Sequence, residues 1–225
     1  MLKIECRTSP GLKIRRSMAK LFQSYLYSLL PEQEHEGYKH PSGKRFKASN
    51  FRIRYEKDRF EICFVSLNQD YEKIVAMAIL KEGLRLGEVH VAQSTVALIE
   101  REPPGRKMMV RGHVCAAIKN PLTGRKIFLE PGESRHTEII TRHSLQKYEA
   151  LLGKSYTGEL SVTPRWQSPR SETFWYDKSA YTVWNARYEI EAEPEMLDLL
   201  LRTGLGSDTM KNLGYLEILP SRPIP

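Results

Sequence analysis

A segment near the C-terminus combines closely spaced glycines with hydrogen-bond donors. Gly204, Gly206 and Gly214 permit positive φ angles and the close approach of another backbone, and Ser207 and Lys211 lie between them. Backbone N–H groups in such a loop can cradle a phosphate. The segment lacks the Gly-Lys-Ser/Thr ending of a P-loop and runs from helix to strand, which excludes a dinucleotide-binding fingerprint. On spacing alone, a mobile connector explains the segment equally well.

A basic strip in the first quarter of the chain, residues 39–54, interleaves cations with aromatic rings. Cations follow phosphates and aromatic faces stack on unpaired bases, so the strip is typical of RNA binding. Its candidate RNA-contacting cations are Lys44, Arg45, Arg52 and Arg54. Arg142, beside His143 on a predicted helix, is a further candidate. A second aromatic and basic stretch lies in a Pro- and Ser-rich loop predicted at residues 165–175.

The net charge of +8 is concentrated in one part of the chain. Residues 1–60 carry 14 Lys and Arg against 6 Asp and Glu, whereas residues 61–225 carry 21 of each. A local basic excess suits a polyanion, most often a nucleic acid. A solubilising surface is the competing interpretation.

The elements that must position these groups follow from the spacing of apolar residues. In the first half the predicted elements are strand 2–7, helix 15–30, strands 47–55 and 60–67, helix 69–83 and strand 88–99. Pro31 ends the first helix, and a polar loop follows at residues 32–43. This β-α-β-β-α-β order predicts a ferredoxin-like unit.

The second half roughly repeats the first after a linker at residues 101–106. Its predicted elements are a hairpin of strands 108–118 and 126–129, helix 137–152, strands 158–166 and 181–193, helix 195–202 and strand 212–219. We therefore expect an α+β protein with two tandem ferredoxin-like (RRM-like) domains, residues 1–102 and 107–225. The functional groove is expected between them.

Composition excludes other classes of protein. No run approaches the roughly 18–20 consecutive apolar residues of a membrane span. The first residues lack the apolar core of a signal peptide, so a cytoplasmic protein is expected. Cys6, Cys63 and Cys115 lie far apart in apolar runs, which predicts buried free thiols rather than a disulfide framework or a structural zinc site.

Segments at both ends of the chain resemble one known family. Residues 204–214 read Gly-x-Gly, five residues and then Asn-x-Gly. This is similar to the signature of the CRISPR-associated endoribonucleases that cut precursor CRISPR RNA, the sixth numbered Cas family of the RAMP superfamily. Asn212 replaces the third glycine of the signature, and asparagine tolerates left-handed backbone. Residues 35–38 followed by 44–51 resemble the family's histidine loop, although Glu34 stands where an apolar residue is common.

The resemblance, which covers almost the full chain, implies cleavage of RNA without a metal or cofactor. The 2′-hydroxyl attacks the adjacent phosphate and leaves a 2′,3′-cyclic phosphate and a 5′-hydroxyl. The reaction needs a base, an acid and a cation that stabilises the phosphorane. Histidine suits the first two roles because its pKa lies near working pH, and lysine suits the third.

On this resemblance the candidate catalytic residues are Tyr27, His35, His40 and Lys47. A histidine acts as general acid or base, Lys47 stabilises the phosphate, and Tyr27 orients the ribose or assists proton transfer. The spacing to Gly37 and Lys47 favours His35, and His40 stays an open alternative. A solvated loop histidine and a core tyrosine are the competing interpretations.

The expected partners are CRISPR repeat RNA, a multisubunit CRISPR effector complex and a second copy of the chain in a homodimer, with no membrane. Two rival functions remain on sequence grounds. One is a non-catalytic RNA-binding scaffold subunit of an effector complex, and the other is a general RNA-binding module.

Overall fold

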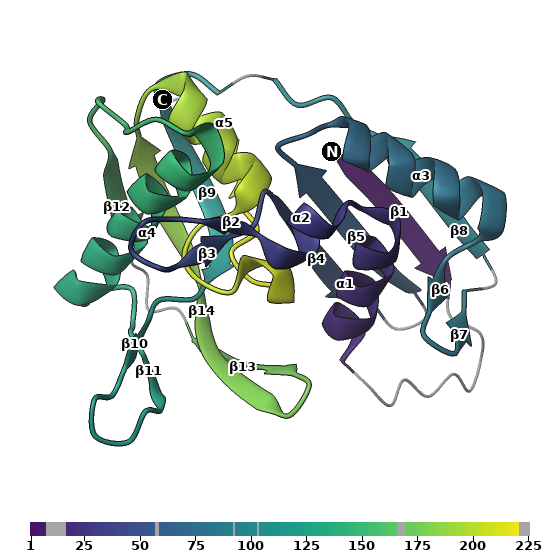
Figure 1. Ribbon diagram of the computed structural model, residues 1–225, viewed down its shortest axis with the longest axis horizontal. Coiled ribbons are helices and arrows are strands. Elements are labelled where there is room, and N and C mark those ends of the chain that lie inside the picture. Colours follow the sequence, from purple (N-terminus) through teal and green to yellow (C-terminus); the bar gives the residue numbers. More distant parts are fainter. Residues whose placement is uncertain (8–16, 57–58, 92, 103, 166–169, 221–225) are drawn as a thin grey trace.

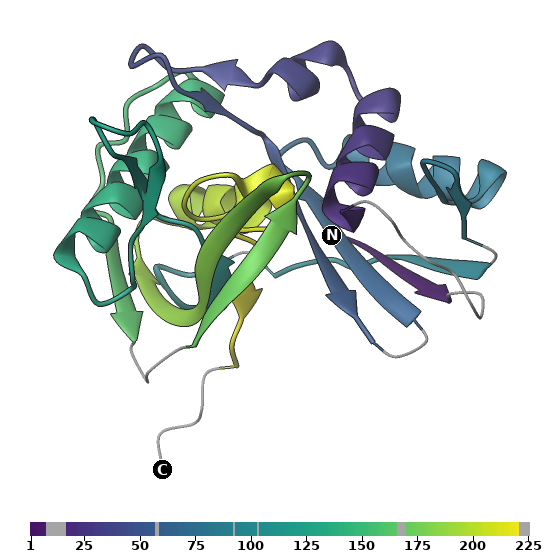
Figure 2. The ribbon, with the colours of Figure 1, turned by 90° about the horizontal axis from the view of Figure 1, so that it is seen from below.

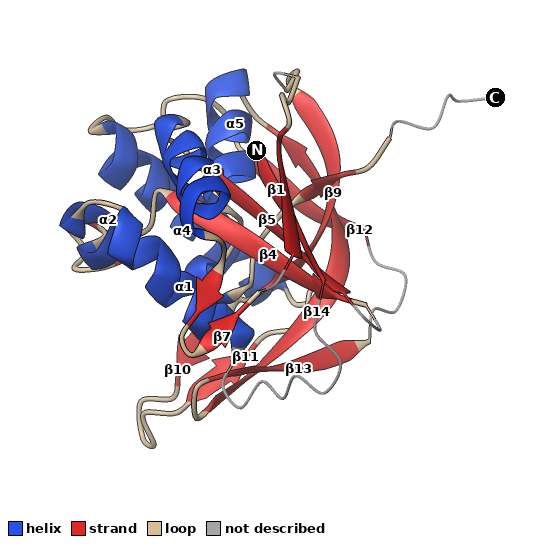
Figure 3. Cartoon of the chain, turned by 90° about the vertical axis from the view of Figure 1, so that its right-hand side faces the viewer, coloured by secondary structure: helices blue, strands red, loops and turns tan. Residues whose placement is uncertain are grey.

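The computed structural model describes residues 1–7, 17–56, 59–91, 93–102, 104–165 and 170–220. Each half of the chain contributes one antiparallel sheet, and the two sheets lie side by side (Figure 1). Figure 3 shows that the helices gather on one side of the sheets. The same molecule seen from below shows the segment around α2 bridging from the first half to the second (Figure 2).

The first half follows the predicted β-α-β-β-α-β order with short additions. Its elements are β1 (Leu2–Arg7), α1 (Met18–Leu29), α2 (Glu32–Glu36), β2 (Tyr38–Lys39), β3 (Arg45–Phe46), β4 (Ser49–Tyr55), β5 (Arg59–Ser66), α3 (Asp70–Glu82), β6 (Arg85–Leu86), β7 (Val89–His90) and β8 (Gln93–Leu98).

The first sheet has the strand order β4-β5-β1-β8. Alternate residues of β1 point inward, so that Leu2, Ile4 and Cys6 are buried against α1 and α3. Phe22 of α1 packs edge-on against Phe51 of β4, with ring centroids 5.1 Å apart. Burial of these apolar side chains is the main stabilising contribution to this half.

The second half repeats the arrangement. Its elements are β9 (Lys107–Val114), β10 (Ala117–Lys119), β11 (Lys126–Phe128), α4 (Ser134–Leu152), β12 (Ser161–Arg165), β13 (Ser171–Tyr176), β14 (Ser179–Glu191), α5 (Pro194–Thr203), the 3₁₀-helix Thr209–Lys211 and β15 (Glu217–Ile218). The sheet order β12-β14-β9-β15 matches that of the first sheet element for element. The strand order therefore bears out the tandem ferredoxin-like prediction in both halves.

Three predicted strands differ most from their expected lengths. The strand predicted at 88–99 breaks, because β7 turns back onto β6 through Gly87 (φ +64°) before β8 begins. The strand predicted at 108–118 ends at Val114, because Cys115 bridges to Gly206 and the chain then leaves the sheet. The strand predicted at 212–219 pairs only at residues 217–218.

The loop predicted at residues 165–175 is partly wrong, since β13 pairs with β14 along residues 171–176. Trp175 on this hairpin is 65% exposed. Residues 166–169 of the same stretch, with Trp166, lie outside the described residues. The prediction of buried free thiols is confirmed for all three cysteines.

Candidate nucleic-acid interface and active site

A cleft of about 310 Å³ opens between the two halves. The first half contributes residues 44–47, and the second half contributes residues of α4 and the glycine-rich loop 204–214. The charged residues lining it are Lys44, Arg45, Lys47, Lys147, Asp208 and Lys211. This excess of cations makes the cleft the natural place in the described structure for an RNA backbone.

Three of the four predicted catalytic residues come together around Lys47, which lines this cleft. The rings of Tyr27 on α1 and His35 on α2 lie 4.7 Å apart. Lys47 Nζ lies 5.2 Å from the centroid of the Tyr27 ring. It donates to the carbonyl of Glu34 at 3.1 Å and also to that of His35. The imidazole of His35 is exposed and has no hydrogen-bond partner in the described part of the chain.

A short helix, which the sequence did not predict, positions His35. The polar stretch 32–43 was predicted as a loop, but α2 forms at its start. Glu32 and Glu34 lie in its first turn, near the positive end of the helix, where an acidic side chain is favourable. Gly37 ends the helix with φ +82°. A Cβ at that position would lie 2.8 Å from the carbonyl oxygen of Phe46. Only glycine therefore lets the end of β3, which directly precedes Lys47, approach the end of α2.

Glu34, which departs from the family pattern, is a buried structural residue. Its carboxylate is 3% exposed and accepts a hydrogen bond of 2.9 Å from the hydroxyl of Tyr38. Burial raises the pKa of this carboxyl above its ordinary value. The polar partners supplied by this chain explain how an acid is accommodated there.

His40 occupies a different environment from His35. It is 9% exposed, and its Nδ1 accepts a hydrogen bond of 3.0 Å from the backbone N–H of Ser42. The other ring nitrogen, Nε2, lies 3.4 Å from a carboxylate oxygen of Glu149 on α4. Both nitrogens are thus engaged, and the residue ties the 38–46 segment to the second half.

The glycine-rich loop is packed against backbone rather than loosely connecting two elements. Gly204, Gly206 and Gly214 have φ angles of +80°, +82° and +71°. A Cβ on Gly206 would lie 2.5 Å from the carbonyl oxygen of Cys115, and one on Gly214 would meet the carbonyl oxygen of Leu205. These glycines are therefore required for the shape of the loop, whatever it binds.

The substitution of asparagine for the third signature glycine has a structural reason. Asn212 adopts the left-handed region with φ +67°. Its Oδ1 accepts a hydrogen bond of 2.6 Å from the backbone N–H of Ile53. Ile53 belongs to β4, the edge strand of the first sheet. Asn212 thus supplies a partner to an N–H on the edge strand and joins the two halves.

Ser207 and Lys211 present polar groups on the loop. The Ser207 hydroxyl lies 3.1 Å from Nδ1 of His143. Burial, with the charges of Lys44 and other neighbouring cations, lowers the pKa of His143 to about 4, so its imidazole is neutral near pH 7. Lys211 Nζ lies 2.7 Å from Asp208 and donates to the Tyr181 hydroxyl at 2.6 Å.

Lys147 also belongs to the cleft and was not among the predicted site residues. Its side chain is fully buried, at 2% exposure, and donates to the carbonyls of Thr203, at 3.2 Å, and Gly204. Burial lowers its pKa to about 7. A signal existed in the sequence, since helical periodicity places Lys147 two turns after Ile140, on the buried face of α4.

The structure separates the predicted RNA-binding arginines into two groups. Arg52 and Arg54 do not line the cleft. Arg52 lies over the Phe174 ring, 5.4 Å from its centroid, and Arg54 forms ion pairs with Glu61 at 3.0 Å and Glu217 at 2.7 Å. Both side chains are used where the two halves meet, and strand alternation alone could not reveal this.

The remaining predicted cations are at or beside the cleft. Lys44 and Arg45 line it, and Lys44 Nζ donates to Gln146 of α4 at 3.1 Å. Arg142 is exposed on α4 and pairs with Glu138 at 3.0 Å. Arg142 therefore stands at the approach to the cleft rather than in its lining.

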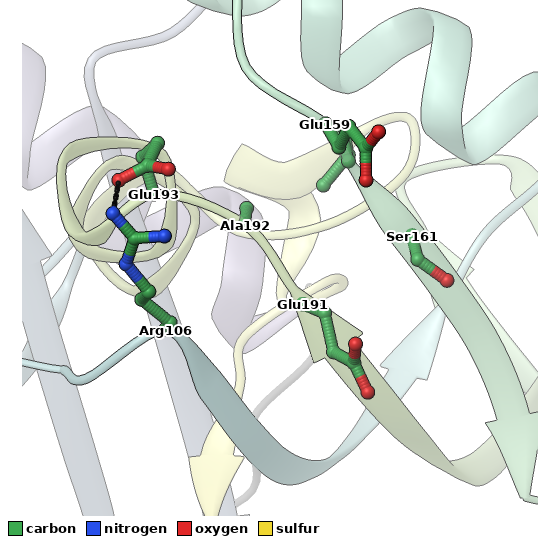
Figure 4. Close-up of a pocket in the computed structure, with 7 residues that line it drawn as sticks. Arg106, Glu159, Ser161, Glu191, Ala192 and Glu193 are labelled. Carbon is green, nitrogen blue, oxygen red and sulfur yellow. Dashed lines mark ion pairs between the residues drawn. The ribbon is translucent and has the colours of Figure 1, made fainter.

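A larger cavity of about 660 Å³ lies elsewhere in the second half (Figure 4). Its lining carries Glu159, Glu191 and Glu193 around Arg106, which pairs with Glu193 at 3.2 Å. The carboxylates of this cavity would repel phosphate, so it is not a candidate for RNA.

Residues 108–218 match the family model described as CRISPR associated protein Cas6, C-terminal. This chain belongs to the Cas6 family. The matched region spans the glycine-rich loop and the second sheet, and the first half supplies the other wall of the cleft. No curated protein matches the sequence.

Solved structures share the fold of this Cas6 protein over nearly the whole chain. A Cas6-related protein from Pyrococcus furiosus aligns with a TM-score of 0.76 and 13% identity, covering 98% of both chains. A RAMP protein described as binding different RNA substrates aligns with a TM-score of 0.73 and 12% identity, covering 98% of this chain and 100% of its own. A Cas6 product complex gives a TM-score of 0.67 and 16% identity, covering 97% and 98%. At these identities the likeness establishes the fold, and the predicted tandem ferredoxin-like class is confirmed.

No helix in the described residues is long and apolar enough to cross a membrane.

Proposed function

We propose that this Cas6 protein is an endoribonuclease that cleaves precursor CRISPR RNA within its repeats, without a metal ion or cofactor. The observation that carries the proposal is the convergence of Tyr27 and His35 on Lys47, which lines a basic cleft together with the glycine-rich loop. The existence of a structural neighbour described as a Cas6 product complex supports it.

The proposed reaction is an internal transesterification. A base removes the proton of the 2′-hydroxyl, the 2′-oxygen bonds to the adjacent phosphorus, and the bond from phosphorus to the 5′-oxygen breaks. An acid returns a proton to that leaving oxygen. The products are a 2′,3′-cyclic phosphate and a 5′-hydroxyl, so atoms and charge balance with no further reactant.

His35 is assigned the role of general acid or general base. Its imidazole is exposed beside Lys47, and both of its nitrogens are available in the described structure. His40 is assigned a structural role because Ser42 and Glu149 engage its two nitrogens. The sequence spacing had left the choice between His35 and His40 open, and the proposal chooses His35.

Lys47 and Tyr27 are assigned to the phosphate and the ribose. An ammonium has three N–H donors, and two of those of Lys47 fix the end of α2. The remaining donor and the charge are assigned to the phosphorane. Burial raises the pKa of Tyr27 to about 12, so its phenol acts as a hydrogen-bond donor at neutral pH and not as a base.

The repeat RNA is expected to run along the cleft from Lys47 toward the loop. Lys44, Arg45, Ser207 and Lys211 would contact successive phosphates, with Arg142 at the approach. Direct contacts from Arg52 and Arg54 are not part of the proposal, because those side chains are engaged between the halves.

Cleavage of a repeat RNA in excess EDTA tests the proposal. We expect cutting to survive EDTA and to disappear when the 2′-hydroxyl at the cut site is replaced by hydrogen. Cutting of the deoxy substrate would rule out the 2′-oxygen as nucleophile. Tight binding of the repeat with no cutting under any condition would favour the non-catalytic scaffold subunit.

A pair of histidine variants tests the assignment within the loop. His35→Ala should slow single-turnover cleavage by roughly 10²–10⁴-fold, the usual contribution of a positioned acid or base, with repeat binding retained. His40→Ala should retain the chemistry and lower thermal stability, because it unties the 38–46 segment from α4. The reverse pattern would transfer the catalytic role to His40.

A further inference from the structure

Two helices end at the cleft, and each end is capped by a lysine that reaches it from another element. Lys47 caps α2 through the carbonyls of Glu34 and His35. Lys147 of α4 caps α5 through the carbonyls of Thr203 and Gly204, where the glycine-rich loop begins. Terminal carbonyls of a helix carry its partial negative charge, which favours a cation there.

Lys147 differs from an ordinary buried cation because it has no carboxylate partner among the described residues. Taking an unpaired ammonium out of water is costly, and an apolar side chain of similar length would fill the space between α4 and α5 without that cost. Packing alone therefore does not explain a lysine at this place. Its two carbonyl partners and its position in the cleft lining point to the loop and its ligand.

We propose that Lys147 is a positioning residue of the RNA site: its ammonium fixes the start of the glycine-rich loop opposite Lys47 and supplies a charge beneath the RNA backbone. The inference rests on the proposed function, because it requires RNA phosphates in the cleft. It predicts that RNA binding and protonation of Lys147 favour each other.

The carboxylates near Lys147 are paired with other cations, so the protonation of Lys147 is expected to respond to the RNA phosphates. The charged and titratable groups on the elements around Lys147 include Arg142, His143, Tyr148 and Glu149 on α4, Lys44, Arg45 and Lys47 on the facing segment, Asp198 and Arg202 on α5, and Asp208 and Lys211 on the loop. The remaining ones on the two helices are Arg135, His136 and Glu138 on α4 and Glu195 on α5. Asp198 pairs with Arg202 at 2.8 Å. Asp208 is already shared by Lys126, at 2.6 Å, and Lys211.

The sign of the pH effect follows from burial. Lys147 has a pKa of about 7, lowered by burial, so near neutral pH a part of the free protein carries it uncharged. A phosphate above it favours the charged form and raises this pKa. RNA therefore binds with proton uptake, and affinity decreases as pH rises through 7. For a rise of about one pKa unit on binding, the linkage predicts about fivefold weaker binding at pH 8 than at pH 6.

The test measures affinity for a repeat RNA carrying a 2′-deoxy substitution at the cut site, at pH 6, 7 and 8 and constant ionic strength. The His35→Ala background removes the exposed imidazole beside Lys47. In this background we expect the fivefold decrease for the protein with Lys147. Lys147→Arg, which stays charged throughout, should bind with a smaller dependence on pH. Lys147→Met should bind weakly with the same reduced dependence.

Lys154→Met is the matched control, because Lys154 is an exposed lysine just beyond α4 that pairs with Glu195. It should keep the full pH dependence. Calorimetry in two buffers of different ionisation enthalpy should show proton uptake for the protein with Lys147 and less for Lys147→Arg. This measurement does not need Lys147→Met to fold.

Equal pH dependence for the protein with Lys147 and for the Lys147→Arg variant, or equal proton uptake by the two, would overturn the inference and leave the proposed function intact. Absence of any repeat binding in the cleft variants and in the parent protein would instead overturn the proposed function, and this inference with it.

Discussion

The two lysine-capped helix ends show how one type of side chain serves two purposes across the same cleft. Lys47 lies at the rim, half-buried, beside the exposed imidazole of His35 and within the field of the Glu34 carboxylate. Lys147 lies in the floor, fully buried, with carbonyls as its only partners in the described structure. A cation at the rim can reach the reacting phosphate, whereas a cation in the floor acts through position and charge.

The two lysines also differ in the helix whose terminal carbonyls they bind. Lys47 fixes a five-residue helix whose last turn carries His35. Lys147 fixes the end of a ten-residue helix, α5, from which the glycine-rich loop departs. One cap thus holds the helix that carries the proposed catalytic His35, and the other holds the start of the glycine-rich loop. Substitutions on the two walls should separate these effects.

The largest expected effect is on the chemistry at the rim. Lys47→Ala should lower the single-turnover cleavage rate by about 100-fold or more, the usual cost of removing one stabilising group from a transition state. Repeat affinity should change much less. A loss confined to affinity, with an unchanged rate at saturating enzyme, would place Lys47 in the binding role given to Lys147.

The stability of the protein should be sensitive to a side chain added to the glycine-rich loop. Gly206→Ala places a Cβ against the carbonyl of Cys115 at positive φ and should lower the free energy of unfolding by about 3 kcal/mol. Gly43→Ala is its matched control, since Gly43 also has positive φ but nothing within 4 Å. It should cost about 1 kcal/mol. Urea denaturation measures both, and equal losses would contradict the tight packing of the loop.

The contact of Asn212 with β4, which joins the two halves, should contribute less to the free energy of unfolding. Asn212→Gly keeps the left-handed backbone but removes the hydrogen bond to the N–H of Ile53, at a cost of about 1 kcal/mol. Asn212→Ala adds backbone strain to the same loss and should cost about 2 kcal/mol. If the glycine variant is the less stable of the two in urea, the left-handed conformation is not what asparagine provides here.

The smallest effect is expected for a lysine with a carboxylate partner in water. Lys154→Ala removes an exposed ion pair with Glu195, and such pairs contribute little to stability. Its urea midpoint should match that of the unmodified protein. A clear decrease would show that the α4–α5 contact depends on this surface pair as well as on Lys147.

Much of the fold could be predicted because its signals are local. Alternation in β1 and helical spacing in α1, α3 and α4 gave element types and the tandem order correctly. The misses involve pairing or capping between distant segments. Helix α2 was missed because its end is capped by Lys47, and β13 was missed because it exists only through its pairing with β14.

The site was predictable in part for the same reason. Tyr27, His35 and Lys47 were found as residue types, and their proximity required the turn from α1 into α2. Arg52 and Arg54 carry the same charge as Lys44. Only the tertiary structure shows that they contact the second half of the chain instead of lining the cleft.

The sequence by itself determined the tandem β-α-β-β-α-β order, the buried thiols and the left-handed positions, because each depends on neighbouring residues or on hydrophobic period. Only the tertiary structure decided which histidine is free, which cations face the cleft and where the buried ammonium lies. Those properties depend on desolvation and on partners far along the chain, such as Lys147 and Thr203, which lie 56 positions apart in the sequence. No local pattern specifies such pairs.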